Sequence, residues 1–146
     1  MSDQRIAPDG ALGGAPGGAH GGSFGDAPDD AAVVAPVPAH EPPYYAVVFT
    51  STRTADQSGY GKTAERMEEL VKDVPGFLGM DQAHTPGGPA ITVGYFRDAA
   101  AVEEWRANVE HRAAKARGRA EWYESYSLHI AKVERSHSFV RGGGEA

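Results

Sequence analysis

The second half of the chain changes its hydrophobic period partway along, from that of a helix to that of a strand. Val102, Trp105 and Val109 recur at intervals of three and four residues, which places them on one face of a helix. After Trp122 the apolar side chains alternate instead, and one strand face is formed by Tyr126, Leu128 and Ile130. A helix that leads directly into a two-faced strand predicts packing on a sheet, which the rest of the chain should supply.

Three more strands and one more helix are predicted ahead of this stretch. Residues 44–54, 77–85 and 90–96 are rich in β-branched and aromatic side chains, and the first of these segments is apolar on both faces. Residues 60–74 carry a helical apolar stripe that Pro75 and Gly76 end, formed by Tyr60, Ala64, Met67, Val71 and Val74. The turn at residues 86–89 has the length that joins antiparallel neighbours.

The resulting order is β-α-β-β-α-β, which predicts an α+β, ferredoxin-like fold with one four-stranded antiparallel sheet and two helices on one face. The second helix is expected to kink near Asn108 and to weaken or end at Gly118. Because the strands are apolar on both faces, a monomer would leave a large apolar patch in water. We therefore expect a homodimer, sheet against sheet, in the form of a dimeric α/β barrel.

The two ends of the chain differ in composition from the middle. Residues 1–43 hold seven of the ten Pro and eight of the nineteen Gly, and large apolar residues are scarce there. Such a segment cannot bury enough apolar area to offset an ordering cost of about 1–2 kcal/mol per residue. We predict a disordered Gly/Pro/Ala-rich tail over residues 1–43, one domain over 44–139, and a second disordered tail over 140–146.

Charge and composition narrow the classes of protein that the chain can represent. A net charge of -6 argues against nucleic acid as the main partner, and the absence of Cys excludes disulfides and thiolate chemistry. No stretch approaches the roughly 18 apolar residues of a membrane helix, and the first twenty residues lack the apolar core of a signal peptide. We expect a soluble, cytoplasmic protein without a metal site, since no two His show the helical i, i+4 ligand spacing.

Five features of the ordered part form a recognisable set. They are YYAVVFTS in the first strand, PGFLG before the second, ITVGYF in the third, the Trp105/His111 pair, and HRAAKARGRAEWY from His111 to Tyr123. With these features the chain resembles the antibiotic biosynthesis monooxygenase family of dimeric α/β-barrel proteins. The resemblance spans about residues 44–139 and implies the fold and the dimer. The superfamily includes cofactor-free oxygenases of aromatic polyketides, haem-degrading enzymes, isomerases and members with no known activity.

The chain departs from the haem-degrading relatives in two respects. Those relatives combine an Asn on the first strand with a Trp and a His on the second helix, whereas this first strand offers Thr50, Ser51 and Thr52. The interval from Trp105 to His111 is also shorter than in the best-known haem degraders. We therefore expect no cofactor, and haem remains the alternative.

Trp105, His111 and Tyr95 are the candidate catalytic residues. A cofactor-free oxygenase needs a base that turns the substrate into an electron-rich anion able to react with O2, and His111 or a Tyr with a lowered pKa could serve. Trp105 and Tyr95 would hold a flat ring. The plainer interpretations are a core position for Trp105 and a partly exposed helical position for His111. The two are about 120° apart on a straight helix, so they share a face only if the helix bends near Asn108.

A substrate-binding role is predicted for four further residues, Tyr60, Tyr123, Tyr126 and Arg112. Each Tyr alone fits a core position, but together they could line a pocket. Arg112 shares a helix face with Lys115 and Arg119, a stripe that could hold a carboxylate and that a solvated helix face also explains.

The leading hypothesis is a monooxygenase, without metal or flavin, that acts on a flat aromatic, polyketide-like substrate between the second helix and the sheet. One alternative is a haem-binding or haem-degrading protein that uses the same cavity. The other is a non-catalytic dimer that binds a small aromatic or anionic ligand. The sequence leaves open whether the protein is an enzyme.

Overall fold

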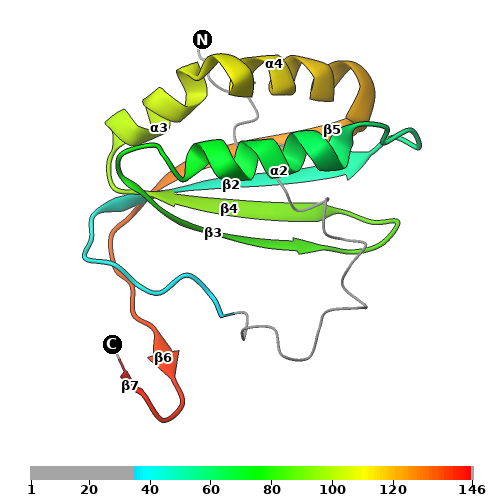
Figure 1. Cartoon of the computed structure of the whole chain (residues 1–146). Coiled ribbons are helices and arrows are strands. Elements are labelled where there is room, and N and C mark those ends of the chain that lie inside the picture. Colours follow the sequence, from blue (N-terminus) through cyan, green and yellow to red (C-terminus); the bar gives the residue numbers. More distant parts are fainter. Residues whose placement is uncertain (1–34, 146) are drawn as a thin grey trace.

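The computed structural model of the protein describes residues 35–145, and Figure 1 shows one sheet with the longer helices on a single face. The elements, in chain order, are β2 (Tyr44–Arg53), α2 (Tyr60–Val71), β3 (Phe77–His84), β4 (Ala90–Phe96), α3 (Ala99–Ala107), α4 (Val109–Arg117), the π-helical turn η3 (Gly118–Trp122), β5 (Tyr123–Val133), β6 (Phe139–Val140) and β7 (Gly144–Glu145).

The sheet has the strand order β3-β4-β2-β5, and every neighbouring pair is antiparallel. The predicted β-α-β-β-α-β order and the ferredoxin-like, α+β fold are therefore confirmed, with the second helix divided into α3, α4 and η3. The homodimer stays a prediction. None of the helices in the described part of the chain is long and apolar enough to cross a membrane.

The main core lies between the helices and the sheet. Strand β2 contributes Val47 and strand β4 contributes Phe96, while α2 buries its predicted stripe and α3 buries Val102 and Trp105. The predicted place of Val109 on the same face is wrong, because Val109 begins α4 and is 78% exposed. The full set of buried core residues is Val47, Met67, Val71, Val74, Phe96, Ala101, Val102 and Trp105. Because successive side chains of a strand point to opposite faces, Ala46 and Tyr95 lie on the sheet face without helices.

The segment before β2 lies against the sheet, although composition assigned it to the tail. The backbone N–H of Val37 donates to Asp81 Oδ1 at 2.9 Å, and that of Ala39 donates to Ser138 Oγ at 3.2 Å. A Cβ added at Gly79 would lie 3.0 Å from Val37 Cγ2, so the side chain of Val37 sits directly over β3. The rest of the predicted tail, residues 1–34, lies outside the described residues.

The C-terminal end also differs from its prediction. Strands β6 and β7 pair with each other in a short antiparallel hairpin, which Figure 1 shows apart from the main sheet. The hairpin begins at Phe139, which the sequence placed at the end of the domain.

Asn108 breaks the second helix, as the sequence predicted. Its backbone has φ -59° and ψ 129°, outside the helical region, and its N–H donates to Trp105 O at the end of α3. Its side-chain Oδ1 accepts from the His111 N–H at 2.9 Å, so the same residue caps the start of α4. One Asn thus ends one helix and begins the next.

Gly118, where α4 passes into η3, lacks a side chain for a steric reason, while its backbone stays helical at φ -59° and ψ -46°. A Cβ at this position would lie 2.6 Å from Tyr123 Cε2, a separation too short for two non-bonded carbons. The absence of a side chain lets the Tyr123 ring pack against the backbone where α4 passes into η3.

Candidate functional site

The rings of Trp105 and His111 are stacked. Their centroids are 4.0 Å apart and their planes differ by 13°. Trp105 lies in the last turns of α3 and His111 in the first turn of α4, so the stack depends on the break at Asn108. The sequence predicted that these two residues share a face only if the helix bends near Asn108, and the structure has this bend.

A hydrogen bond fixes the His111 ring. Its Nδ1 lies 3.0 Å from the backbone oxygen of Trp105. Since a carbonyl oxygen only accepts, Nδ1 must carry the hydrogen, and in the neutral ring Nε2 then carries the lone pair. The imidazole is thus held in the tautomer in which Nε2 is the basic nitrogen.

Both rings of this pair are buried. Trp105 is 2% exposed and His111 is 1% exposed, so the interpretation of His111 as a partly exposed residue is wrong. Trp105 belongs to the main core, and its Nε1 is buried without a hydrogen-bond partner among the described residues. A buried N–H without a hydrogen-bond partner lowers the stability of the fold by about 1–3 kcal/mol, so its presence requires a physical reason.

Tyr95 lies on the other side of the sheet from this pair. Its ring meets that of Tyr44 edge to face, with 6.1 Å between the ring centroids. Burial raises the pKa of Tyr95, and the nearby Asp81 and Tyr44 raise it further. Within one subunit the sheet separates Tyr95 from Trp105, so the structure does not bring together the two residues that were predicted to hold one ring.

The three predicted substrate-binding tyrosines do come together, at the end of the sheet where α2 begins. We call them, with their two aromatic neighbours, the tyrosine cluster: Tyr60, Tyr123, Tyr126, Phe49 and Trp122. Ring centroids are 6.4 Å apart for Tyr60 and Tyr123 and 5.9 Å apart for Tyr123 and Tyr126. Burial raises the pKa of Tyr60 and raises that of Tyr123 well above its usual range. These phenols are protonated at neutral pH, which opposes the idea of a Tyr with a lowered pKa.

Arg53 joins this cluster and was missed by the sequence analysis. Its guanidinium carbon lies 4.2 Å from the centre of the Tyr60 ring, a cation–π contact, and its Nη1 donates to Gln57 Oε1 at 3.3 Å. Beside it opens a pocket of about 330 Å³ that His84 also lines. Burial and the Arg53 charge lower the pKa of His84. The sequence did contain a signal for Arg53, namely a positively charged residue at the end of an otherwise apolar strand.

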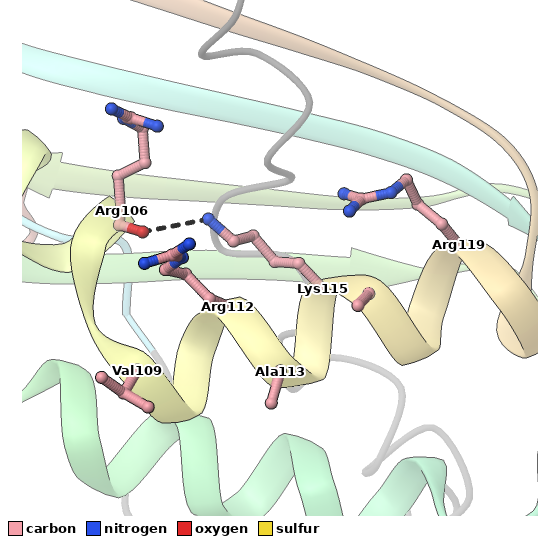
Figure 2. Close-up of a pocket in the computed structure, with 7 residues that line it drawn as sticks. Arg106, Val109, Arg112, Ala113, Lys115 and Arg119 are labelled. Atoms are coloured by element: carbon pink, nitrogen blue, oxygen red, sulfur yellow. Dashed lines mark hydrogen bonds between the residues drawn. The ribbon is translucent and has the colours of Figure 1, made fainter.

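Arg112 lines a larger pocket, of about 640 Å³, on the side of α4 shown in Figure 2. The predicted stripe of Arg112, Lys115 and Arg119 forms part of its wall, together with Arg106 from α3. The Lys115 Nζ donates to the Arg106 backbone oxygen at 3.1 Å. Arg106 was missed because spacing across a helix break does not give the direction of a side chain.

The described residues contain no group of three or more His, Asp or Glu that could hold a metal ion. The candidate site is the stacked Trp105/His111 pair, with Arg106 of α3 and Arg112 and Lys115 of α4 nearby in the chain.

Comparison with known proteins gives a family and a set of folds. The family model described as antibiotic biosynthesis monooxygenase matches residues 43–117. Among curated proteins, the uncharacterized protein YqjZ of Bacillus subtilis (strain 168) is 50% identical over 99 residues, which cover 68% of this chain and 87% of YqjZ.

Solved structures with a similar fold include SnoaB, a cofactor-independent oxygenase from Streptomyces nogalater. It aligns with a TM-score of 0.55 at 12% identity, over 65% of this chain and 97% of SnoaB. The protein PA3566 from Pseudomonas aeruginosa aligns with a TM-score of 0.53 at 16% identity, over 67% of this chain and 99% of its own. At such identities the likeness establishes the fold alone.

Proposed function

The chain belongs to the antibiotic biosynthesis monooxygenase family, and from this premise we propose that it is a monooxygenase that uses neither metal nor flavin. Its substrate would be a flat aromatic, polyketide-like compound bound between the α3–α4 pair and the sheet. The likeness in fold to SnoaB, described as a cofactor-independent oxygenase, supports this reaction class.

One observation carries the proposal, namely the stack of His111 on Trp105 with its fixed tautomer. The indole supplies a flat apolar wall, and Nε2 of His111 supplies a base that can take a proton from an acidic carbon of the substrate. The carbanion then passes one electron to O2, and the two radicals combine to a peroxide anion. The protonated His111 returns its proton to this anion and gives a hydroperoxide. Loss of water leaves a carbonyl, so that a CH2 group and O2 give C=O and H2O.

Substrate access requires the pair to open, because both rings are buried. The break at Asn108 is the natural place for such movement, since two short helices meet there without a continuous backbone ladder. A substrate oxygen beside Trp105 would accept from Nε1, the buried donor that lacks a partner among the described residues. Binding would then satisfy a hydrogen bond that the folded chain leaves unmade.

A homodimer is part of the proposal. On the sheet face without helices, Ile91 is 42% exposed, and Val93 next to it is half-buried. Val48 of β2 pairs with Val93 across the strands and is also half-buried, so an apolar strip runs across the middle of this face. A second copy packed on it by two-fold symmetry would remove the strip from water. Sedimentation velocity at micromolar concentration tests this directly, and a well-folded monomer would contradict it.

Oxygen consumption tests the reaction. The purified protein is mixed with an anthrone, and uptake of O2 is followed together with formation of the anthraquinone. We expect turnover that falls by about 10²-fold or more in His111→Asn, a variant whose amide can still donate to the Trp105 carbonyl but which has no basic nitrogen. Equal rates in the two proteins would rule out His111 as the base.

A non-catalytic, ligand-binding dimer is the second candidate, and the burial of both Trp105 and His111 favours it. No oxygen uptake over a panel of aromatic substrates would support this candidate. Haem binding has less support, because His111 is 1% exposed and iron could reach its Nε2 only after the ring leaves its buried position. A haemin titration with a Soret shift that His111→Asn abolishes would favour haem after all.

A further inference from the structure

Four basic side chains from three consecutive helical elements line one pocket. They are Arg106 of α3, Arg112 and Lys115 of α4, and Arg119 of η3, and we call this site the basic pocket. Figure 2 shows Arg106, Arg112 and Lys115 gathered where α3 and α4 meet, with Arg119 further along the chain in η3. None of the described residues that line the pocket is acidic. In a chain with a net charge of -6, this is a marked local excess of positive charge.

Helix geometry and the break at Asn108 account for the convergence. Arg112, Lys115 and Arg119 follow one another at intervals of three and four residues, so they share one face of the continuous helical stretch formed by α4 and η3. The break then turns the end of α3 toward this face, and Lys115 Nζ reaches the Arg106 backbone oxygen at 3.1 Å. Lys115 is only 8% exposed, so it forms the floor of the pocket rather than its rim.

Several nearby acidic side chains are bound elsewhere. The Glu110 carboxylate accepts from Arg66 of α2 at 2.8 Å, and Glu121 accepts from Arg117 at 3.1 Å. Glu103 pairs with one of the pocket residues, since its carboxylate accepts from Arg106 Nε at 3.1 Å.

For Arg112, by contrast, the described part of the chain supplies no ion pair and no side-chain hydrogen bond partner. Like charges held close together repel, so this arrangement favours an anion that lies among them.

We propose that the basic pocket binds the oxyanion group, a carboxylate or a phosphate, of an aromatic ligand. The planar guanidinium of Arg112 can donate two parallel hydrogen bonds to such a group, and Arg119 adds charge. For the identity of the aromatic body this inference rests on the proposed function. Binding of the anion, however, can be tested without any turnover.

The basic pocket adjoins the Trp105/His111 pair, because α3 and α4 contribute residues to both sites. Trp105 precedes Arg106 in α3, and His111 lies one turn before Lys115 in α4. The His111 ring hydrogen-bonds the Trp105 carbonyl and the Lys115 amine hydrogen-bonds the Arg106 carbonyl. A ligand whose oxyanion is held in the pocket would therefore have its ring directed toward the stacked pair.

A comparison of charged and neutral ligands of one shape tests the proposal. The full chain is titrated with 2-naphthoate, 2-naphthamide and 2-naphthyl phosphate by isothermal calorimetry. We expect one of the two anions to bind about tenfold or more tightly than the amide, and the preference to shrink as salt screens the exposed charges. Whichever anion binds more tightly identifies the oxyanion.

Matched variants locate the site. Arg112→Gln and Arg119→Gln should each weaken anion binding about tenfold and leave naphthamide binding unchanged. Arg135→Gln makes the same charge change at an exposed position beyond β5 and should have no effect. Equal affinity for anion and amide, or an equal loss in Arg135→Gln, would overturn the proposal. Oxygen uptake that fails while charge-dependent binding persists would refute the oxygenase and leave the basic pocket in place.

Discussion

The imidazole of His111 lies flat on the indole of Trp105 with a centroid distance of 4.0 Å, although six positions and a helix break separate the two residues. A continuous helix would turn them about 120° apart. The stack thus exists only because Asn108 leaves the helical conformation and then caps the following helix with its own side chain.

The first prediction concerns Asn108→Ala. Loss of the cap should lower the free energy of unfolding by about 0.5–2 kcal/mol, measured by urea denaturation. Because α3 and α4 then lose the residue that separates them, the near-UV circular dichroism of Trp105 should change as well. Asp98→Ala removes the cap at the start of α3, where Asp98 Oδ1 accepts from the Ala101 N–H at 2.9 Å. This control should cost a similar amount and leave the near-UV signal unchanged.

The second prediction separates the core role of Trp105 from its stacking role. Trp105→Ala removes a buried aromatic from the main core and should cost about 3–5 kcal/mol of unfolding free energy. Trp105→Phe keeps a flat ring over His111 and should cost clearly less. If Trp105→Ala kept the stability of the unmodified protein, the core contribution of the indole would be refuted.

The third prediction uses two glycines with opposite surroundings. Gly118→Ala places a Cβ 2.6 Å from Tyr123 Cε2 and should destabilise the protein by about 1–3 kcal/mol, because the ring must move. Gly61→Ala, inside α2 with nothing within 4 Å, should stabilise it by up to about 1 kcal/mol. Thermal unfolding of the two variants should shift in opposite directions, and a common direction would refute the steric explanation.

The fourth prediction concerns stability at alkaline pH. Burial raises the pKa of Tyr123 well above the usual value of 10.0, and burial also raises that of Tyr60. Above pH 10 the unfolded chain loses phenol protons that the folded chain keeps, so the unfolding free energy should fall as the pH rises. Urea titrations between pH 9 and pH 11 should show this fall. In Tyr123→Phe the slope should be smaller, and an unchanged slope would show that Tyr123 is not responsible.

Much of the fold could be read from the sequence, because hydrophobic periodicity reports local geometry. The stripe of α2 appears as predicted, and Tyr60, Ala64, Met67 and Val71 are all buried. The bend near Asn108 was also predicted, and the structure shows that Asn108 caps α4 with its own side chain. Both features depend on neighbours in sequence.

The arrangement of the site was harder to predict, because it depends on contacts between distant segments. Strands β2 and β4 are apolar on both faces, so alternation showed which residues share a face but not which face meets the helices. For this reason Tyr95 was grouped with Trp105, although the sheet lies between them. The burial of His111 and the approach of Arg106 both depend on the angle at Asn108, which no spacing rule supplies.

The segment that precedes β2 shows what composition overlooks. Its contacts are made mostly by backbone groups, such as the Val37 N–H with Asp81 and the His40 carbonyl with Ser136 Oγ, and backbone groups leave no trace in a hydropathy pattern. Val37 also covers Gly79, on the side of the sheet that a second subunit would approach. A chain shortened to begin at residue 44 would therefore present a different docking surface, and its state of association would not represent that of the intact protein.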